Sequence, residues 1–280
     1  MADFVIPFDR LPDRFVQSVR NPPRVPVAAR PAATIVLMRD GREGMEVLLL
    51  RRNRNAGFVP GAYVFPGGRV DGSDAGERVT DYLDGLDGPT AARRLELPDG
   101  DPPALAYYLA ALREAFEETG ILVGRGEDGT PAATAAEDPE VDAVRDDLME
   151  ERLTFAQALD RLGFRLDGGA VEYLAHWITP EAEPRRYDTR FFAAGVHAGA
   201  RAIVDPREMT DAVWLTPDAA LRRNRESSLP MVFPTIRTLE QLRGRESVDA
   251  ALADLGGLSV PAIMPRLVLT PTGVGMEVEP

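Results

Sequence analysis

The chain has 280 residues, 44% of them hydrophobic and 28% charged, which is typical of a folded globular protein. Its basic residues are all arginine, and they number 32 against 45 acidic residues. The resulting net charge of −13 argues against nucleic acid or an anionic membrane surface as a partner. The lack of lysine and cysteine excludes P-loop lysines, Schiff-base enzymes, thiol nucleophiles and cysteine-ligated metals. No apolar run could span a bilayer and the first residues do not resemble a signal peptide, so we expect a cytoplasmic protein.

The first third of the chain predicts an arm followed by short strands. Residues 1–30 are rich in proline and arginine and are expected to be irregular. Apolar runs then predict three strands, the first two joined by an Asp40-Gly41 turn: Ala33–Met38, Glu46–Arg51 and Tyr63–Phe65. Residues 71–102 are acidic and predict a loop, with a short helix near Thr80–Leu86.

The clearest predicted helix runs from Pro103 to about Thr119, with Pro at its first turn and Gly120 just after its end. Its apolar residues fall on one face at helical spacing: Leu105, Tyr108, Leu109, Leu112 and Phe116. Glu114, Glu117 and Glu118 are spaced i, i+3 and i+4, so their carboxylates share the opposite stripe.

The rest of the chain alternates helices and strands and contains no internal repeat. Residues 125–152 are acidic and predict partial helix. Further helices are expected at Phe155–Leu162, from Thr216-Pro217-Asp218 onward, near Pro234–Leu242 and near Val248–Leu255. Strands are expected at Tyr173–Ile178, Arg190–Gly195, Thr210–Leu215 and Leu267–Leu269.

The three glutamates predict a metal site. Like charges on one stripe, near the negative C-terminal end of a helix, repel one another and the helix dipole, and a divalent cation would relieve both penalties. Carboxylate oxygens suit Mg²⁺ or Mn²⁺. The alternative is an ordinary acidic face exposed to water.

Two segments carry a resemblance to the Nudix family. Arg113-Glu114-Ala115-Phe116-Glu117-Glu118-Thr119-Gly120-Ile121 resembles the helical half of the Nudix box, and Phe65-Pro66-Gly67-Gly68 resembles its first half. The sequence departs from the box in two respects. About 31 additional residues separate its halves, and Asp74 stands where the family has Glu.

A longer resemblance, over roughly residues 31–245, is to long Nudix proteins similar to mitochondrial and peroxisomal coenzyme A diphosphatases. It is carried by Arg51-Arg52-Asn53, Gly57-Phe58-Val59-Pro60-Gly61, Trp177-Ile178-Thr179-Pro180 and the segment 184–192. The coenzyme A signature of shorter family members has Arg where this chain has Gly57. The resemblance implies one α/β domain, a Nudix α/β/α sandwich with a mixed sheet. It would carry an N-terminal arm (1–30), an insertion inside the box (75–102) and a helical C-terminal extension (225–280).

The resemblance also implies the metal ligands and the catalytic residues. The carbonyl of Gly68 and the carboxylates of Glu114, Glu117 and Glu118 would hold Mg²⁺ or Mn²⁺. Arg113 would orient a carboxylate. The general base would be Glu208, Glu117 or Glu118.

The expected substrate-binding residues come from three segments, and the arginines among them could instead be exposed surface charges: Arg51, Arg52, Arg54, Phe65, Arg185 and Arg186. Trp177 would stack on a base or pack in the core, and His176 is expected to be structural.

The expected function is metal-dependent hydrolysis of a nucleoside diphosphate linked to another moiety, with coenzyme A or acyl-coenzyme A as the leading substrate. An ADP-ribose or NADH-type dinucleotide is the alternative substrate, and an inactive Nudix-like ligand sensor is the alternative from another class. We expect a small-molecule partner, no nucleic acid or membrane, and a possible homodimer. The insertion would either form a wall of the substrate pocket or merely cover the apolar side of the long helix.

Overall fold

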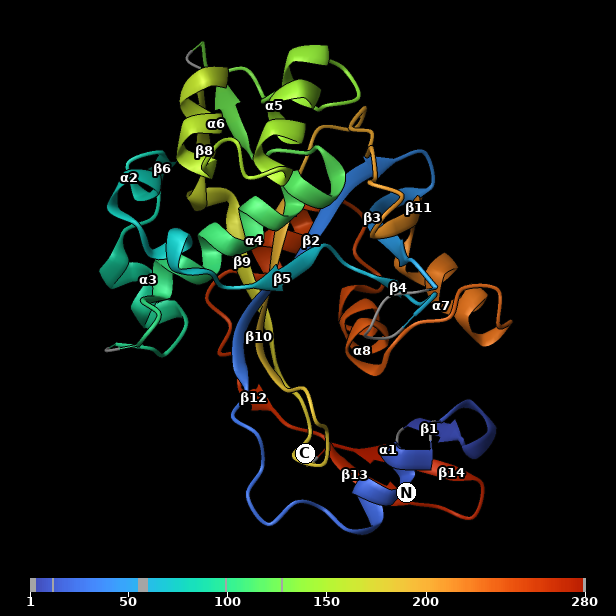
Figure 1. Ribbon diagram of the computed structural model, residues 1–280. Coiled ribbons are helices and arrows are strands. Elements are labelled where there is room, and N and C mark those ends of the chain that lie inside the picture. Colours follow the sequence, from blue (N-terminus) through green and yellow to red (C-terminus); the bar gives the residue numbers. More distant parts are fainter. Residues whose placement is uncertain (1–3, 12, 55–59, 99, 127, 279–280) are drawn as a thin grey trace.

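The computed structural model describes residues 4–11, 13–54, 60–98, 100–126 and 128–278 (Figure 1). Its main sheet has the strand order β11-β3-β2-β10-β9-β12. These strands are β2 (Arg30–Gly41), β3 (Gly44–Arg52), β9 (Val171–Ile178), β10 (Tyr187–Gly195), β11 (Met209–Leu215) and β12 (Ala262–Ile263). The sheet is mixed, because β10 runs parallel to β2 and antiparallel to β9. A mixed α/β fold is thus confirmed.

Strands β2 and β3 form a hairpin but separate beyond its turn, and residues 63–69 pair with both strands there. The two strands pair with each other only at their turn, where Met38 lies opposite Val47. Beyond it, β4 (Tyr63–Val64) pairs with β3 and β5 (Gly67–Arg69) pairs with β2. The paired backbone therefore fixes the Gly67-Gly68 segment within the sheet.

Helices cover both faces of this sheet (Figure 1). α4 (Ala104–Thr119) packs on β2 and β5 on one face, against Ala33, Ile35 and Leu37. The opposite face of β2 presents Val36 and Met38 to a second apolar cluster. That cluster is covered by α7 (Pro217–Arg225), α8 (Phe233–Leu242) and α9 (Val248–Leu255). Burial on both faces explains why β2 and β3 are apolar without strict alternation.

The described part of residues 71–102 is more ordered than the predicted loop. It contains the 3₁₀ helix η2 (Gly72–Ala75), which leads into the insertion, followed by α2 (Glu77–Thr80), β6 (Leu83–Asp84) and α3 (Gly88–Arg94). The helix expected near Thr80–Leu86 is wrong, because Leu83 instead pairs in parallel with Leu166 of a distant strand. α3 was not predicted, although the Asp87 side chain accepts a hydrogen bond from Thr90 N at 2.7 Å and caps it.

A second small sheet joins the insertion to the segment after α4. Its order is β6-β8-β7, with β7 at Gly124–Gly126 and β8 at Phe164–Asp167. The neighbouring helices are α5 (Pro139–Met149) and α6 (Phe155–Leu162), and the short η3 (Gly168–Ala170) follows β8. The bounds expected for α6 are confirmed. Its Thr154–Gln157 capping box and the left-handed Gly163 mark both ends.

The described part of the N-terminal arm is irregular mainly at residues 21–29, and regular structure before them corrects the prediction for residues 1–30. It contains β1 (Phe4–Pro7), η1 (Phe8–Arg10) and α1 (Asp13–Arg20). β1 pairs with β14 (Gly273–Glu277), which also pairs with β13 (Arg266–Leu269). The partner of β1 lies at the other end of the chain, so no local pattern could reveal it. The C-terminal extension accordingly contains strands besides α8 and α9.

In the ranges described, every helix is too short or too polar to cross a lipid bilayer.

Phe192 tests the α4 face of the core. Its side chain is fully buried, and its ring centroid lies 4.4 Å from that of Tyr108 and 5.8 Å from that of Tyr173. We expect Phe192→Ala to lower the free energy of unfolding by about 3–5 kcal/mol, because a cavity would remain between the two tyrosines. Urea denaturation measures the change. Val25→Ala, at a side chain 83% exposed, should change it by less than about 0.5 kcal/mol. Similar values for the two variants would contradict this packing.

Candidate active site

α4 holds the glutamate stripe at its C-terminal end. The helix buries Tyr108, Leu112 and Phe116 completely, and it ends at Gly120, which adopts a left-handed φ of 69°. The remaining stripe carries Glu114, Glu117 and Glu118. Glu118 itself is only 8% exposed, so these carboxylates do not form an open acidic face.

Arg113 binds most of the surrounding acceptors. Its Nε and Nη2 donate to the two carboxylate oxygens of Asp74 at 2.8 and 3.1 Å. Its Nη1 donates to Glu114 at 3.0 Å and to Glu117 at 2.9 Å. Nη2 also donates to the Arg69 carbonyl at 3.1 Å. A guanidinium has five N–H groups, and all of them are used here.

Asp74 is a residue of this site to which the sequence assigned no role. It stands at the box position where the family has Glu, and its side chain is 2% exposed. Besides its two bonds with Arg113, it accepts a hydrogen bond from the Asp71 backbone N at 2.8 Å. The shorter Asp therefore still reaches the arginine, because η2 brings its backbone close. The motif position was the signal that could have identified it.

The glycine pair lies directly against the carboxylates. Gly67 N donates to Glu118 Oε2 at 3.0 Å. A Cβ built on Gly67 would lie 2.6 Å from the Ala33 carbonyl oxygen, and one built on Gly68 would overlap the Glu114 carboxylate. Gly67 has no room for a side chain because backbone atoms block it, whereas a side chain at Gly68 would require the Glu114 carboxylate to move.

The glutamates face a cavity of about 430 Å³, which we call the carboxylate cavity. Its walls come from η2, α4, the loop between α5 and α6, and the loop before β11. The lining residues are Asp71, Ser73, Arg113, Glu114, Glu117, Glu118, Leu148, Met149, Glu151, Leu153, Thr154, Phe155, Asp205, Glu208 and Met209. The structure therefore brings Glu208 to the same cavity as the α4 glutamates. The sequence gave no sign of Glu151 or Asp205.

The cavity is strongly acidic, and Arg113 is the one basic residue among the described residues that line it. Burial raises the pKa of Glu114 to about 7, against the opposing effect of Arg113. Burial also raises the pKa of Glu117. The pKa of Glu118 lies well above its usual range, because its carboxyl is buried and lies near Glu114. Crowded, desolvated carboxylates of this kind are stabilised by a bound cation.

The donor set suits a hard divalent cation, since its side-chain donors are oxygens. In the described ranges, however, no three acidic or histidine side chains are arranged around a common point as metal ligands. Glu114 and Glu117 bond to Arg113 instead. The residues expected to hold Mg²⁺ or Mn²⁺ are thus gathered without being arranged as a coordination shell.

The arginines at the end of β3 lie near this site. The positive charge of Arg52 partly opposes the rise in the pKa of Glu118. The buried Nε of Arg52 has no hydrogen-bond partner among the described residues. Arg51 lies 5.8 Å from the ring centroid of Tyr63, and Arg54 is exposed. The neighbouring Asn53 N donates to the Glu208 carbonyl at 2.8 Å, which links this segment to the loop before β11. Gly57, which stands where the coenzyme A signature has Arg, lies outside the described residues.

The remaining expected substrate residues are not gathered at the carboxylate cavity. Phe65 is 4% exposed and packs in the second apolar cluster, beneath the glycine segment. Arg186 donates to the Thr179 and Val27 carbonyls at 2.9 and 2.8 Å, and Arg185 is exposed. These bonds of Arg186 tie the β9–β10 connection to the segment before β2.

Two further residues considered from the sequence are structural. Trp177 is 6% exposed, and its ring centroid lies 5.7 Å from that of Phe233 in the core. His176 Nε2 lies 2.5 Å from the Asp188 carboxylate, away from the lining of the carboxylate cavity.

Comparisons with known proteins agree with this geometry. A family model described as the NUDT19 Nudix domain matches residues 27–242. The chain is 29% identical over 236 residues to the acyl-coenzyme A diphosphatase NUDT19 of Gallus gallus, covering 73% of this chain and 62% of that protein. With the Homo sapiens protein of the same name it shares 30% identity over 210 residues, covering 64% of this chain and 55% of that protein. The chain thus spans less than two thirds of these relatives.

Among solved structures, a NUDIX hydrolase from Alicyclobacillus acidocaldarius superposes with a TM-score of 0.67 at 29% identity. The superposition covers 84% of this chain and 99% of that one. The likeness therefore extends over nearly all of that hydrolase.

The contact between Gly68 and Glu114 predicts a selective effect of a single methyl group. We expect Gly68→Ala to weaken Mn²⁺ binding by about tenfold or more, because the added Cβ would displace the Glu114 carboxylate. Isothermal titration of chelator-stripped protein measures the affinity. Gly72→Ala is the matched control, since its Cβ would meet no atom within 4 Å. Equal affinities in the two variants would show that Glu114 does not need its observed position.

Proposed function

The chain belongs to the Nudix hydrolase superfamily through its NUDT19-type domain, and we propose that it hydrolyses the diphosphate of acyl-coenzyme A. The observation that carries the proposal is the set of glutamates held by Arg113 around one cavity with Glu208. The substrate class rests on the printed names of the relatives, which are acyl-coenzyme A diphosphatases.

The acidity of the cavity implies a metal cofactor. A diphosphate is an anion and would be repelled by the carboxylates unless cations were present. Nudix proteins typically use divalent metals, and Glu114, Glu117, Glu118 and the Gly68 carbonyl are the groups proposed to hold Mg²⁺ or Mn²⁺. When bound, such ions neutralise phosphate oxygens and lower the pKa of a coordinated water.

The chain's own residues then position the reactants. A water oxygen forms a bond to one phosphorus while the bond from that phosphorus to the bridging oxygen breaks, which leaves two phosphate monoesters. Glu208 is the proposed acceptor of the water proton, because it lines the cavity and is exposed to solvent. Glu118 is less suited, since its carboxylate already accepts from Gly67 N. Glu117 remains the other candidate.

Arg52 is the proposed phosphate-binding residue. It lies close enough to Glu118 to lower the pKa of that carboxyl, and its Nε has no protein partner in the described residues. A guanidinium with an unused N–H next to the carboxylates can donate to a phosphate oxygen. Arg51 and Arg54, on the same segment, would add positive charge at the mouth of the site.

The alternative of an inactive sensor is less consistent with the site. A binding module does not require three glutamates on one helical stripe, each desolvated at a cost to the folded state. Cytoplasmic location and a homodimer stay predictions.

The central glutamates should be essential for turnover. With Mg²⁺ or Mn²⁺, we expect the protein to convert lauroyl-coenzyme A and coenzyme A into adenosine 3′,5′-bisphosphate and the matching 4′-phosphopantetheine, identified by mass spectrometry. Glu118→Gln should lower kcat by at least about 100-fold through loss of a metal ligand. The same substitution at Glu240, an exposed residue of α8, should leave kcat unchanged.

ADP-ribose and NADH belong in the same assay as alternative substrates. Faster turnover of either would replace the acyl-coenzyme A assignment. If no diphosphate were hydrolysed, the ligand-sensor alternative would be favoured.

A further inference from the structure

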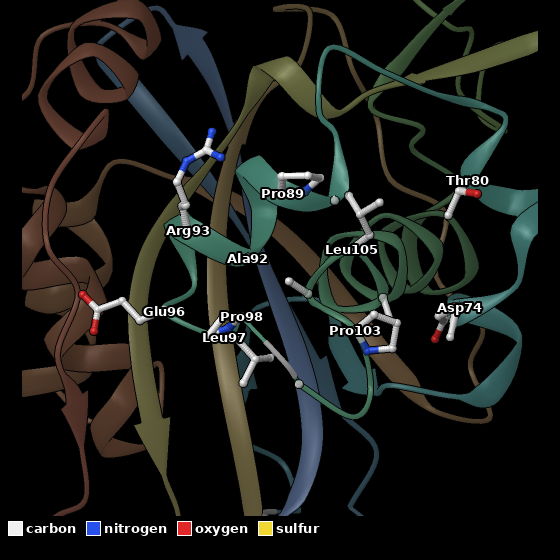
Figure 2. Close-up of a pocket in the computed structure, with 15 residues that line it drawn as sticks. Asp74, Thr80, Pro89, Ala92, Arg93, Glu96, Leu97, Pro98, Pro103 and Leu105 are labelled. Carbon is white, nitrogen blue, oxygen red and sulfur yellow. The ribbon is translucent and has the colours of Figure 1, made fainter.

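A second and larger cavity lies between the insertion and the first turn of α4 (Figure 2). Its volume is about 760 Å³, within the range of small-molecule binding sites. We call it the insertion cavity. Its lining residues are Asp74, Ala75, Thr80, Gly88, Pro89, Ala92, Arg93, Glu96, Leu97, Pro98, Gly100, Pro103, Ala104, Leu105 and Ala106.

The lining of the insertion cavity is mostly apolar. Leu97 and Leu105 are only partly buried, so they present apolar surface to the space between them. Figure 2 shows three prolines around the same space, while the charged ends of Arg93 and Glu96 point away from Leu105 and Pro103. Partly exposed leucines in a concave site are stabilised when an apolar ligand covers them.

The charged residues of the lining do not offer a phosphate site. Arg93 Nη2 donates to Thr90 Oγ1 at 2.9 Å on the surface of α3. Both oxygens of Asp74 bond to Arg113. A ligand of this cavity is therefore held mainly by its apolar atoms, which favours the acyl part of a coenzyme A ester over the nucleotide and diphosphate parts.

The insertion cavity and the carboxylate cavity are neighbours, because both are lined by residues of the η2 segment. Asp71 and Ser73 line the carboxylate cavity, while Asp74 and Ala75 line the insertion cavity. A long substrate whose diphosphate lies at the α4 glutamates can therefore reach the insertion cavity with its far end. In acyl-coenzyme A the far end is the acyl chain, the most apolar part of the molecule.

We propose that the insertion cavity binds the acyl chain of acyl-coenzyme A. The inference rests on the proposed function, since it assumes that the diphosphate occupies the carboxylate cavity. It also decides between the two roles considered for the insertion: α3 and the lining residues at 96–98, 100 and 103 form a wall of the substrate site rather than a mere cover for α4.

Equilibrium binding tests the proposal without requiring turnover. Isothermal titration would compare coenzyme A with lauroyl-coenzyme A in the presence of Mg²⁺, on Glu208→Gln protein, which lacks the proposed base but keeps the proposed metal ligands. We expect lauroyl-coenzyme A to bind at least about tenfold more tightly, because each buried methylene contributes to affinity. Leu105→Trp, which places a bulkier side chain in the part of the cavity next to α4, should reduce this preference at least about fivefold and leave the Kd of coenzyme A unchanged.

Two further variants complete the experiment. Leu97→Arg places a charge in the cavity from a partly exposed position, and it should abolish the preference even if Leu105→Trp does not fold. Leu269→Trp is the matched control, because Leu269 is 45% exposed on β13 and lines neither cavity. It should retain the preference.

The outcomes separate this inference from the proposed function. Equal affinities for the two ligands, no binding of either, or a preference that survives both cavity variants would overturn the insertion cavity as the acyl site. Hydrolysis of coenzyme A by the wild-type protein would still support the diphosphatase in those cases. A preference for lauroyl-coenzyme A that is lost in the variants, without hydrolysis by the wild type, would support the acyl site and reject the diphosphatase.

Discussion

The buried ion pair between Arg113 and Asp74 is the interaction on which the site depends. A guanidinium 6% exposed is costly to bury unless every N–H has an acceptor, and here each one does. Although burial alone would lower it, the pKa of Arg113 is raised overall by Asp74 and the two neighbouring glutamates. The same five bonds join η2, β5 and α4. The arginine therefore fixes the start of the insertion relative to the helix that carries the carboxylates.

The rest of the fold forms the walls of the cavity around the α4 glutamates. The opened β2–β3 hairpin admits the glycine segment, whose backbone contacts Glu114 and Glu118 without side chains in the way. The α5–α6 loop and the loop before β11 close the carboxylate cavity and add further acidic groups. Their combined charge disfavours an anionic ligand by itself and favours one that arrives with cations. This charge distribution supports the proposed metal-dependent hydrolysis of a diphosphate.

Local patterns predicted the parts of the structure that local interactions determine. The bounds of α6 and α9 match, because their caps and apolar faces lie within the helices themselves. β1 and β6 were missed, since their partners β14 and β8 lie far along the chain. In the site, spacing alone placed the α4 glutamates together. It could not reveal that Phe65 packs in the core or that Arg186 binds backbone carbonyls, because both depend on tertiary contacts.

The most direct test is the kcat for lauroyl-coenzyme A of Asp74→Asn compared with Asp71→Asn. Asp74 makes two close bonds to Arg113, whereas Asp71 is 53% exposed and its carboxylate lies 3.8 Å from that guanidinium. We expect Asp74→Asn to lower kcat by about tenfold or more, in protein that remains folded, because the arginine no longer holds the carboxylates in place. Asp71→Asn should have little effect. An unchanged kcat in folded Asp74→Asn protein would contradict the role of this ion pair.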